Sequence, residues 1–451
     1  MLAHWTTLHN SQLIENGILE IGDGYRAKNS ELSTNGLPFA RAGNIDNGFH
    51  FEEADILDDS SVRKAGSKIS QPNDIVFTSK GTVGRFAFVK PETPRFVYSP
   101  QLCYWRIRKP SIIDPRFLFY WMHGRDFHHQ VHQVKSLTTM ADYVSLSDQR
   151  KMKIAAPPLT IQHTIAGILS AYDDLIENNA RRIAILEEMA RMLYDEWFVK
   201  FRFPGHEEVK MVESEMGMIP EGWEPSPLGA LASEVRRGVN PEVIDPETPY
   251  FGLEHLPRRS IALSEWGIAR EVQSTKLSFQ KDEILFGKIR PYLHKVGVAP
   301  LNGVCSSDTI VISIKQKKYF GFVLCCVSSD NFVDHANKTS QGTHMPRANW
   351  DILVKYPLAL PPESLLALFN ETIRSFVTAI HNWIFRNRNL RRTRDLLLPK
   401  LISGEIDVSS WIENEVGEQE VTVASELGMI REMEPAKPID VAAMQQRLLW
   451  E

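Results

Sequence analysis

Cysteine and long apolar runs are scarce in this sequence. Among its 451 residues there are only four cysteines, and no two of them form the C-x-x-C pair that is typical of metal sites. No basic segment followed by an apolar core opens the chain, and no apolar run is long enough to cross a bilayer. We therefore expect a cytoplasmic protein of a reducing compartment, whose buried free thiols are Cys103, Cys305, Cys325 and Cys326.

An excess of positive charge is also missing. The 51 lysine and arginine residues are outnumbered by 56 aspartate and glutamate residues, which gives a formal net charge of −5. A nucleic-acid-binding domain usually carries a strongly basic surface. The overall charge therefore argues against a DNA partner unless positive charge is concentrated locally. The other proportions, 43% hydrophobic and 24% charged residues, are ordinary for a globular chain of two or three domains.

The usual motifs of catalysis are absent too. The sequence has no G-x-x-x-x-G-K-[ST] phosphate loop, and Gly22-Asp23-Gly24 lacks the third glycine of a dinucleotide-binding turn. The one histidine cluster consists of His128, His129 and His132, whose first and last members lie one helical turn apart. Because no carboxylate or cysteine is near, a metal pair is less favoured than a solvated helix face or a DNA-facing polar patch. We predict no catalytic, cofactor-binding or metal-binding residues.

The sequence does contain a long helical pattern that occurs twice. Residues 161–200 and 365–401 align at a constant shift of 204, which pairs Ile161 with Leu365. Apolar residues recur in steps of three and four, which is typical of the narrow seam of a coiled coil. About forty residues at 1.5 Å each predict a rod of about 60 Å. The predicted spacer seam comprises Ile165, Leu169, Tyr172, Ile176, Leu186 and Leu193 in the first helix, and Phe369, Ile373, Phe376, Ile380, Leu390 and Leu397 in the second.

The globular segments that precede the two helices also match each other. Asp74 to Phe77 corresponds to Glu283 to Phe286 at a shift of 209, and residues 97–107 correspond to 304–314 at a shift of 207. The segment around Pro38 matches that around Pro249 at a shift of 211. Small steps in the shift are what loop insertions and deletions within a duplicated domain would produce.

This repeat predicts a mixed α/β fold. Two α/β domains are separated by two long antiparallel helices that form a coiled coil, with a pseudo-two-fold internal repeat. Residues 214–219 recur once more as 425–430, so the unit begins a third time, which fits a cyclic arrangement. The predicted segments are a first domain at 1–155, a spacer helix at 156–203, a polar linker at 204–222, a second domain at 223–360, a second spacer helix at 361–403 and a C-terminal tail at 404–451.

Within the first domain, short strands are predicted at residues 74–77, 84–89 and 101–107, where apolar and β-branched runs lie between turn residues. A single helix is predicted over 114–132. Its aromatic and apolar face would consist of Phe117, Tyr120, Trp121, Phe127 and Val131.

Several short motifs fit this layout. They are Gly17 to Lys28, Ile219 to Trp223 with Leu228, Pro157-Pro158 before Ile165 to Leu169, and Leu398 to Ile406. On these motifs and on the duplicated domain-plus-helix layout, the chain resembles the specificity subunit of type I restriction-modification systems over nearly its whole length.

The resemblance implies that two target-recognition domains each read one half of a bipartite, asymmetric double-stranded DNA site. The two helices would pack as a spacer that sets the unread gap. Two adenine-methylating modification subunits would dock on the assembly, and restriction subunits, which are translocase-nuclease motors, would join them. The specificity subunit itself would not be catalytic. S-adenosylmethionine, ATP and Mg are expected on the partner subunits, and no membrane is expected.

The geometry of the repeat agrees with this implication. A near two-fold relation between the copies puts two equal rods antiparallel and two globular domains at opposite ends. Such a layout suits two patches of DNA at a fixed interval, because half-site spacing on a duplex is a rigid constraint. The first seam includes the polar Asn179, a kind of position that often fixes register.

Loops expected to contact DNA lie at corresponding places in the two copies. Arg26 corresponds to Arg237, and a nearby glycine lets each backbone approach a phosphate. These loops differ while the strands agree, as two domains that read different half-sites require, although any surface loop collects such residues. The predicted DNA-binding residues are Arg26, Lys28, Lys80, Thr82, Arg85, Gln101, Ser136, Thr138 and Thr139 in the first copy, and Arg237, Lys288, Arg290, Tyr292, Asp308, Gln341, Thr343 and His344 in the second.

Two features of the helices have competing interpretations. The basic run of Arg386, Arg388, Arg391, Arg392 and Arg394 could bind phosphate, but we favour pairing with Asp173 and Asp174 of the first helix. The aromatic end of the first helix, at Trp197, Phe198, Phe201 and Phe203, could equally dock a partner or pack on the adjacent domain.

Three functions follow in order of preference. The first is a non-catalytic DNA-recognition subunit. The second is a structural adapter whose duplicated arms bind two partner proteins and no DNA, which the modest net charge favours. The third is a nuclease that uses Asp74 and Glu283, and it is disfavoured because these residues start apolar strands and have no lysine at a recognisable spacing.

Overall fold

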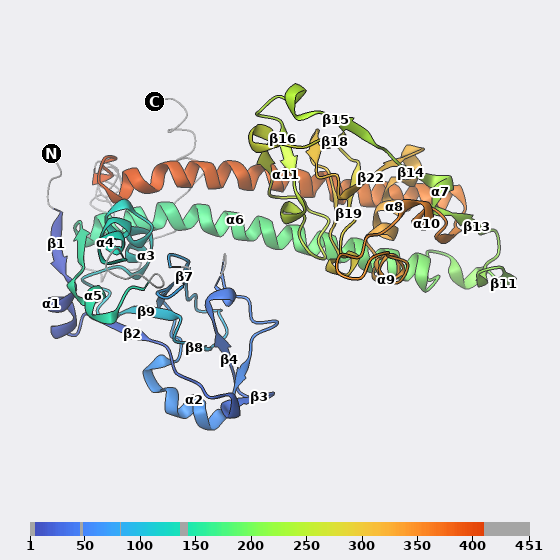
Figure 1. Ribbon diagram of the computed structural model, residues 1–451. Coiled ribbons are helices and arrows are strands. Elements are labelled where there is room, and N and C mark those ends of the chain that lie inside the picture. The colour runs from blue at the N-terminus through green and yellow to red at the C-terminus, as the bar shows by residue number, and fades with distance from the viewer. Residues whose placement is uncertain (1–4, 46–47, 82, 136–142, 410–451) are drawn as a thin grey trace, which may run out of the picture. The chain divides into compact units, whose positions relative to one another are not determined.

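The structure is a computed structural model that describes residues 5–45, 48–81, 83–135 and 143–409 (Figure 1). The chain forms two compact units. The first contains the residues up to Asp174 together with those from Arg391 onward, and the second runs from Leu175 to Leu390. Each of the two long helices contributes to both units. The domain boundaries predicted above follow the sequence repeat instead, and they stay predictions.

The first unit is built around a four-stranded antiparallel sheet in the order β2-β9-β6-β7. All residues of β6 and β9 are buried, which explains the continuous apolar runs in their sequences. A second sheet has the order β3-β5-β4-β8, and β1 pairs with β10. The elements are β1 Thr6–His9, α1 Asn10–Glu15, β2 Leu19–Asp23, β3 Leu32–Ser33, β4 Leu37–Ala40, β5 Ile56–Leu57, α2 Asp59–Ala65, β6 Ile75–Thr78, β7 Phe86–Phe88, β8 Val97–Tyr98, β9 Leu102–Ile107, α3 Pro115–Met122, α4 Arg125–Lys135, α5 Leu146–Lys151, β10 Lys153–Ala156 and the start of α6 Leu159–Tyr194.

The second unit has a four-stranded sheet in the order β14-β22-β19-β20 and a five-stranded sheet in the order β15-β18-β21-β16-β17. Strand β13 pairs with β23, and β11 pairs with β12. The elements are β11 Met211–Ser214, β12 Gly217–Pro220, β13 Glu224–Pro227, α7 Leu228–Leu231, β14 Ala232–Glu234, β15 Arg237–Val239, β16 Pro249–Phe251, β17 Gly267–Ile268, β18 Lys276–Phe279, β19 Ile284–Gly287, β20 Val296–Val298, β21 Gly303–Cys305, β22 Thr309–Ile314, α8 Phe320–Val327, α9 Asp330–Lys338, α10 Trp350–Leu353, β23 Pro357–Leu360 and α11 Glu363–Ile402.

The two units repeat the same topology. The order β2-β9-β6-β7 in the first corresponds to β14-β22-β19-β20 in the second. Each unit also has one parallel strand pair, in which Phe39 pairs with Val97 and Tyr250 with Val304. The paired residues of the two copies differ by the shifts of 211 and 207 that the sequence predicts. The predicted mixed α/β fold and its internal repeat are therefore confirmed at the level of strand pairing.

The single helix predicted over 114–132 is wrong in one respect, because the segment forms two helices, α3 and α4. The break falls at His123 and Gly124. A Cβ added to Gly124 would lie 3.0 Å from the carbonyl oxygen of Trp121 and 3.1 Å from a methyl carbon of Ile402. The glycine therefore allows a close approach that a continuous helix of larger residues would not. The predicted aromatic face is buried, including Trp121 and Phe127.

The segment predicted as a polar linker at 204–222 contains the β11-β12 hairpin, in which Ser214 pairs with Gly217. Gly217 has φ 91°, a left-handed conformation that glycine adopts without strain. Ile219 of this segment is buried in the core of the second unit. The linker is therefore partly structured, because an apolar side chain anchors it.

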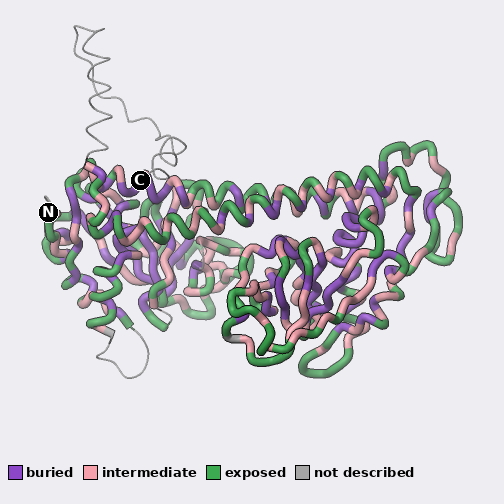
Figure 2. Tube along the Cα trace, turned by 90° about the horizontal axis from the view of Figure 1, so that it is seen from above, coloured by how far each residue is buried: buried purple, intermediate pink, exposed green. Residues whose placement is uncertain are grey.

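The two long helices run antiparallel within the second unit. Asn179 of α6 contacts Asn387 of α11, and Phe198, which follows α6, packs against Phe369 of α11. Residues later in the first helical segment therefore contact residues earlier in α11. Figure 2 shows buried segments alternating with exposed ones along both helices.

The predicted seam residues are buried or half-buried. Six are fully buried, namely Ile165, Leu169, Tyr172, Phe369, Ile373 and Ile380. The other six, Ile176, Leu186, Leu193, Phe376, Leu390 and Leu397, are half-buried. Within the described residues, neither these helices nor any other helix is both long and apolar enough to cross a membrane.

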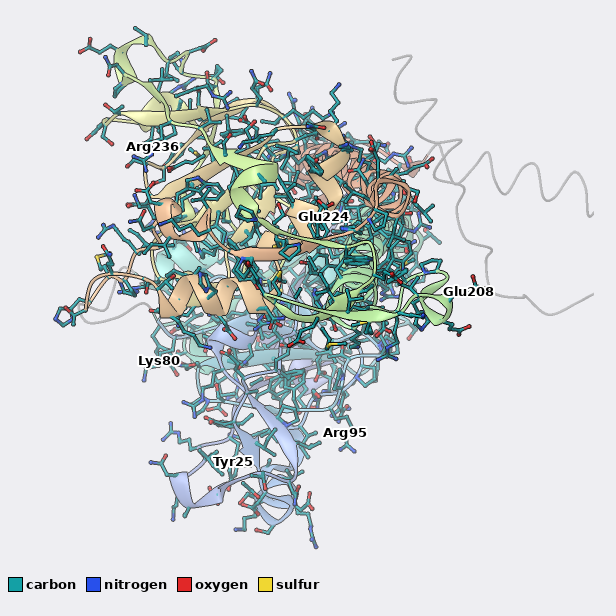
Figure 3. All side chains as sticks on the ribbon, turned by 90° about the vertical axis from the view of Figure 1, so that its right-hand side faces the viewer. Tyr25, Lys80, Arg95, Glu208, Glu224 and Arg236 are labelled. Atoms are coloured by element: carbon teal, nitrogen blue, oxygen red, sulfur yellow. The ribbon has the colours of Figure 1, made fainter. Side chains whose placement is uncertain are left out.

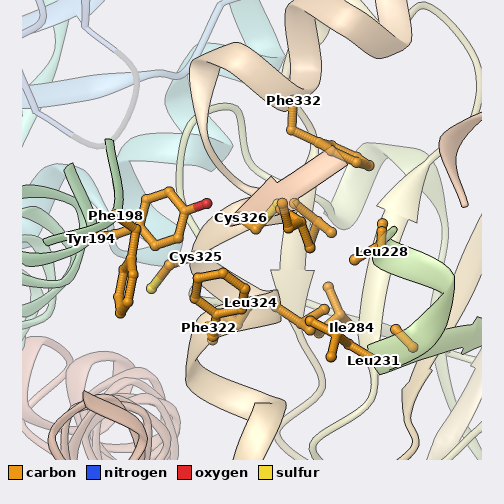
Figure 4. Close-up of a cluster of buried hydrophobic side chains, with 14 of the residues drawn as sticks. Tyr194, Phe198, Leu228, Leu231, Ile284, Phe322, Leu324, Cys325, Cys326 and Phe332 are labelled. Atoms are coloured by element: carbon orange, nitrogen blue, oxygen red, sulfur yellow. The ribbon is translucent and has the colours of Figure 1, made fainter. Parts of the chain in front are cut away.

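A large apolar cluster fills the second unit, and Figure 4 shows part of it. Trp197, Phe198 and Phe203 are buried in this cluster, and Phe201 packs against it. Packing, rather than partner docking, therefore accounts for the aromatic end of the first helix. The cluster also contains two of the four cysteines, and all four are free and buried, as predicted.

Candidate nucleic-acid interface

Three loops of the first unit meet around the backbone of Ala42. Arg85 donates from Nη1 to the Ala42 carbonyl oxygen at 3.3 Å, and the Ala42 N–H donates to Oε1 of Gln101 at 3.1 Å. The N–H of Ser79 donates to the carbonyl oxygen of Gln101 at 3.0 Å, which places the following residue, Lys80, in the same group of loops. The structure thus brings together the predicted residues Lys80, Arg85 and Gln101.

The segment that carries Arg26 lies against the turn before Gln101. The Tyr25 N–H donates to the Tyr98 carbonyl oxygen at 2.7 Å. A Cβ on Gly24 would lie 1.9 Å from the carbonyl oxygen of Ser99, so only glycine allows this approach. Arg26 and Lys28 are exposed, whereas the Tyr25 hydroxyl donates to Glu31 at 3.0 Å. Figure 3 labels Tyr25 and Lys80.

Two basic side chains around these loops are paired with carboxylates. Lys68 donates to Oδ1 of Asp23 at 2.7 Å, and Arg41 pairs with Asp55 at 2.5 Å. Lys80 is exposed, and no described residue pairs with its ammonium group. The remaining predicted residues of the first copy, Thr82, Ser136, Thr138 and Thr139, lie outside the described residues.

The corresponding loops of the second unit surround a hollow of about 430 Å³. The Lys288 N–H donates to the Asp308 carbonyl oxygen at 2.8 Å, and the Arg290 N–H donates to the Pro346 carbonyl oxygen at 2.7 Å. Lys288 and Gln341 line the hollow. Predicted residues from three loops, Lys288, Asp308 and Gln341, are thereby brought together.

Arg290 and Tyr292 lie on a strained turn next to this hollow. Arg290 and His294, which flank the turn, both have φ 50°, in the left-handed region that side chains rarely adopt. Arg290 and Tyr292 are exposed, and burial lowers the pKa of the His294 imidazole. The predicted residues Thr343 and His344 are exposed as well.

Arg237 occupies a different environment from the other predicted residues. Its guanidinium is half-buried, and it forms an ion pair with the Glu283 carboxylate. The neighbouring Arg236, labelled in Figure 3, lines the hollow and pairs with Glu234 at 2.8 Å. Of two consecutive arginines, the one next to glycine was selected from the sequence. Which of them lines the hollow depends on the backbone between β14 and β15, so no local signal could decide it.

Arg347 is a further residue that the sequence did not single out. It lines the hollow and pairs with Asp308 at 3.5 Å. The only available signal was its position at the end of the loop that contains Thr343 and His344, since no motif marks it.

The carboxylates considered for a nuclease have structural roles. Asp74 is buried and accepts from Nε and Nη2 of Arg106 at 2.6 and 2.7 Å, and from the Tyr98 hydroxyl at 2.6 Å. Asp74 and Glu283 each also accept a backbone N–H three residues earlier, at 2.8 and 2.7 Å. Across the part of the chain that the structure describes, no group of three or more His, Cys, Asp or Glu residues could hold a metal.

The basic run of α11 is used partly for pairing, as favoured. Arg394 donates to Asp173 at 2.5 Å, and Asp173 also accepts from the Tyr120 hydroxyl at 2.6 Å. Asp174 pairs with Lys90 at 3.3 Å instead of with the run. The guanidinium of Arg388 lies 3.7 Å from the ring centroid of Trp266.

Comparison with known proteins agrees with this architecture. Residues 16–188 match the model of the family described as the type I restriction modification DNA specificity domain. The type I restriction enzyme MjaIX specificity subunit of Methanocaldococcus jannaschii is 25% identical over 366 residues, which cover 78% of this chain and 82% of that protein. The EcoDI specificity subunit of Escherichia coli is 24% identical over 344 residues, covering 68% and 73%.

A solved structure has the same fold. The type I restriction-modification system S subunit from M. genitalium superimposes with a TM-score of 0.54 at 15% identity, covering 88% of this chain and 96% of that one. The chain is therefore similar, over most of its length, to the specificity subunits of type I restriction enzymes. This similarity confirms the resemblance drawn from the sequence motifs.

Proposed function

We propose that this chain is a non-catalytic specificity subunit that reads a bipartite, asymmetric DNA site, with one half-site for each copy of the repeated domain. The observation that carries the proposal is that equivalent loops gather in both units while their side chains differ. Lys80 and Gln101 in the first unit occupy the positions that correspond to those of Ile289 and Asp308 in the second. Similar scaffolds with different loop chemistry suit two different half-sites.

Exposed basic residues on these loops supply the local positive charge that the net charge of −5 conceals. Lys80 and Arg290 are exposed, and no described residue pairs with their charged groups. The left-handed conformation of Arg290 supports a functional role, because such strain concentrates at binding loops. We rank Arg237 below them, since Glu283 already holds its guanidinium.

The antiparallel helices act as the spacer that sets the gap, and together with the domains they present docking surfaces to two adenine-methylating modification subunits. Restriction subunits join the same complex in the cytoplasm. The S-adenosylmethionine, ATP and Mg of the reactions bind to those partners. Phosphate neutralisation is shared with the partners, which is consistent with an acidic recognition subunit.

The test is a methylation readout from cells that express this chain with its modification subunit. Long-read sequencing of the host DNA should show methylated adenines in one bipartite motif with a constant gap. No protected adenines would overturn the proposal and favour the adapter alternative.

A second experiment tests the individual loops. Lys80→Ala and Arg290→Ala in the assembled complex should each weaken DNA binding, and each should reduce the salt slope by about one if the charge contacts a phosphate. Lys355→Ala, at an exposed lysine in the turn before β23, is the matched control and should leave both unchanged. A variant that binds DNA as the Lys355→Ala control does would show that its loop is not part of the interface.

A further inference from the structure

The Nε atom of the Arg347 side chain contacts a carboxylate, and its terminal amino groups face away from that contact. Its Nε lies 3.5 Å from Oδ1 of Asp308. No described residue pairs with its two terminal amino groups, and its side chain is 47% exposed beside the 430 Å³ hollow. An arginine whose Nε side faces a carboxylate presents its terminal fork away from that carboxylate.

The backbone of Arg347 is pinned from both sides. Its N–H and carbonyl oxygen exchange hydrogen bonds with Gln341 at 2.9 and 3.0 Å. It also forms an antiparallel bridge with Ile289, and the following N–H, of Ala348, donates to the Lys288 carbonyl oxygen at 2.9 Å. The guanidinium thus projects from a fixed position rather than from a free loop tip.

The backbone of Asp308, the carboxylate partner, is also held by hydrogen bonds. The Asp308 N–H donates to the Ser306 hydroxyl at 3.2 Å, and its carbonyl oxygen accepts from Lys288. Asp308 comes directly before β22, so the central sheet of the second unit positions it. Asp308 is therefore a positioning residue for Arg347.

We propose that Arg347, oriented by Asp308, reads a guanine in the half-site of the second domain. This inference rests on the proposed function and adds the identity of one base and its reader. A planar fork of two N–H groups matches O6 and N7 of guanine in the major groove, which no other base offers as a pair of acceptors.

The equivalent position in the first unit has different chemistry. Tyr143 bridges Lys80 there, as Arg347 bridges Ile289. Tyr143 is 44% exposed and carries no fork of donors. Arg347 is thus specific to one copy, as a base-reading residue for one half-site must be, whereas a phosphate clamp has no reason to differ between copies.

The experiment uses the complex of the full chain with its modification subunit, and the methylated motif of host DNA is the readout. Arg347→Ala should make one G·C position in one half-site degenerate, with discrimination at that position falling roughly tenfold to a hundredfold. The other half-site and the gap should be unchanged. Arg270→Ala is the matched control, because Arg270 is another exposed arginine paired with a carboxylate, that of Glu247.

Arg347→Lys separates base reading from phosphate binding. Lysine keeps the charge but lacks the fork, so the same position should again become degenerate. A motif that stays intact in Arg347→Lys, or methylation that falls equally at all sites in Arg347→Ala, would overturn the proposal in favour of a phosphate contact. An altered half-site with no G·C pair in the wild-type motif would overturn it as well.

Failure of the broader function gives a different result. If the wild-type complex methylates no bipartite motif, the proposed function itself fails. If the wild type methylates such a motif and Arg347→Ala leaves it unchanged, only the guanine assignment is lost.

Discussion

Asn179 of α6 donates from Nδ2 to Oδ1 of Asn387 of α11 at 2.8 Å. Both residues are buried, at 7% and 5% exposure, and Asn387 also donates to the Ile176 carbonyl oxygen at 3.1 Å. A matched polar pair is satisfied at only one alignment of the two helices, whereas apolar contacts tolerate several. The polar position noted in the sequence thus has its partner in the second helix.

Removing one member of this pair should be more harmful than removing both. Asn179→Ala leaves the Asn387 oxygen buried without a donor, and we expect a loss of about 1–3 kcal/mol in unfolding free energy. The double variant Asn179→Leu with Asn387→Leu should be neutral or stabilising. Urea unfolding measures both, with exposed Asn178→Ala as the control. A double variant that loses more than the single one would contradict this.

The buried ion pair of Arg106 with Asp74 should dominate the stability of the first unit's sheet. Arg106→Ala leaves a fully buried carboxylate without its cation, and we expect a loss of about 3–5 kcal/mol. Arg108, two residues on, has a side chain that is 44% exposed and pairs with Glu20 at 2.5 Å. Arg108→Ala should cost less than about 1 kcal/mol, measured in the same unfolding experiment. Equal losses from the two variants would show that burial of this pair is unimportant.

The close approach of Gly24 to Ser99 predicts a combined loss of stability and recognition. Gly24→Ala forces the two backbones apart, and we expect a loss of about 1–3 kcal/mol together with weaker reading of one half-site. Gly43→Ala is the control, because a Cβ there would meet nothing within 4 Å. Thermal unfolding and the methylated motif are the two measurements. Intact reading of both half-sites by Gly24→Ala would separate this loop from recognition.

Buried His381 predicts a loss of stability in mild acid. Burial lowers the pKa of its imidazole to about 4 from 6.5, although Asp282 lies 3.9 Å away. The unfolded chain therefore takes up a proton before the folded chain does. The full stabilisation is present above pH 6.5, and up to about 3 kcal/mol is lost as the pH falls toward 4. Unfolding free energies measured across this range should show a shallower slope in His381→Leu, and an unchanged slope would exclude this histidine as the cause.

The duplicated plan of this protein was readable from the sequence. The spacing of apolar residues indicates helices and strands without knowledge of the tertiary structure. The sequence shifts of 211 and 207 therefore already related the parallel pair Phe39 with Val97 to the pair Tyr250 with Val304. The burial of the four cysteines followed from the sequence as well. The break at Gly124 did not, because it depends on contacts with Trp121 and Ile402, one of them far along the chain.

The partners of charged side chains were decided only by the tertiary structure. Asp74 and Glu283 begin equivalent strands, yet Arg106 neutralises the first and Arg237 the second, from different elements. Arg236 and Arg347 reach the same hollow from positions more than a hundred residues apart. Hydrophobic periodicity is local and survives in the sequence, whereas the meeting of an arginine with a carboxylate depends on long-range folding. The sequence alone therefore determined that one domain-plus-helix unit occurs twice, and the fold decided which charged side chains of its loops are held by partners.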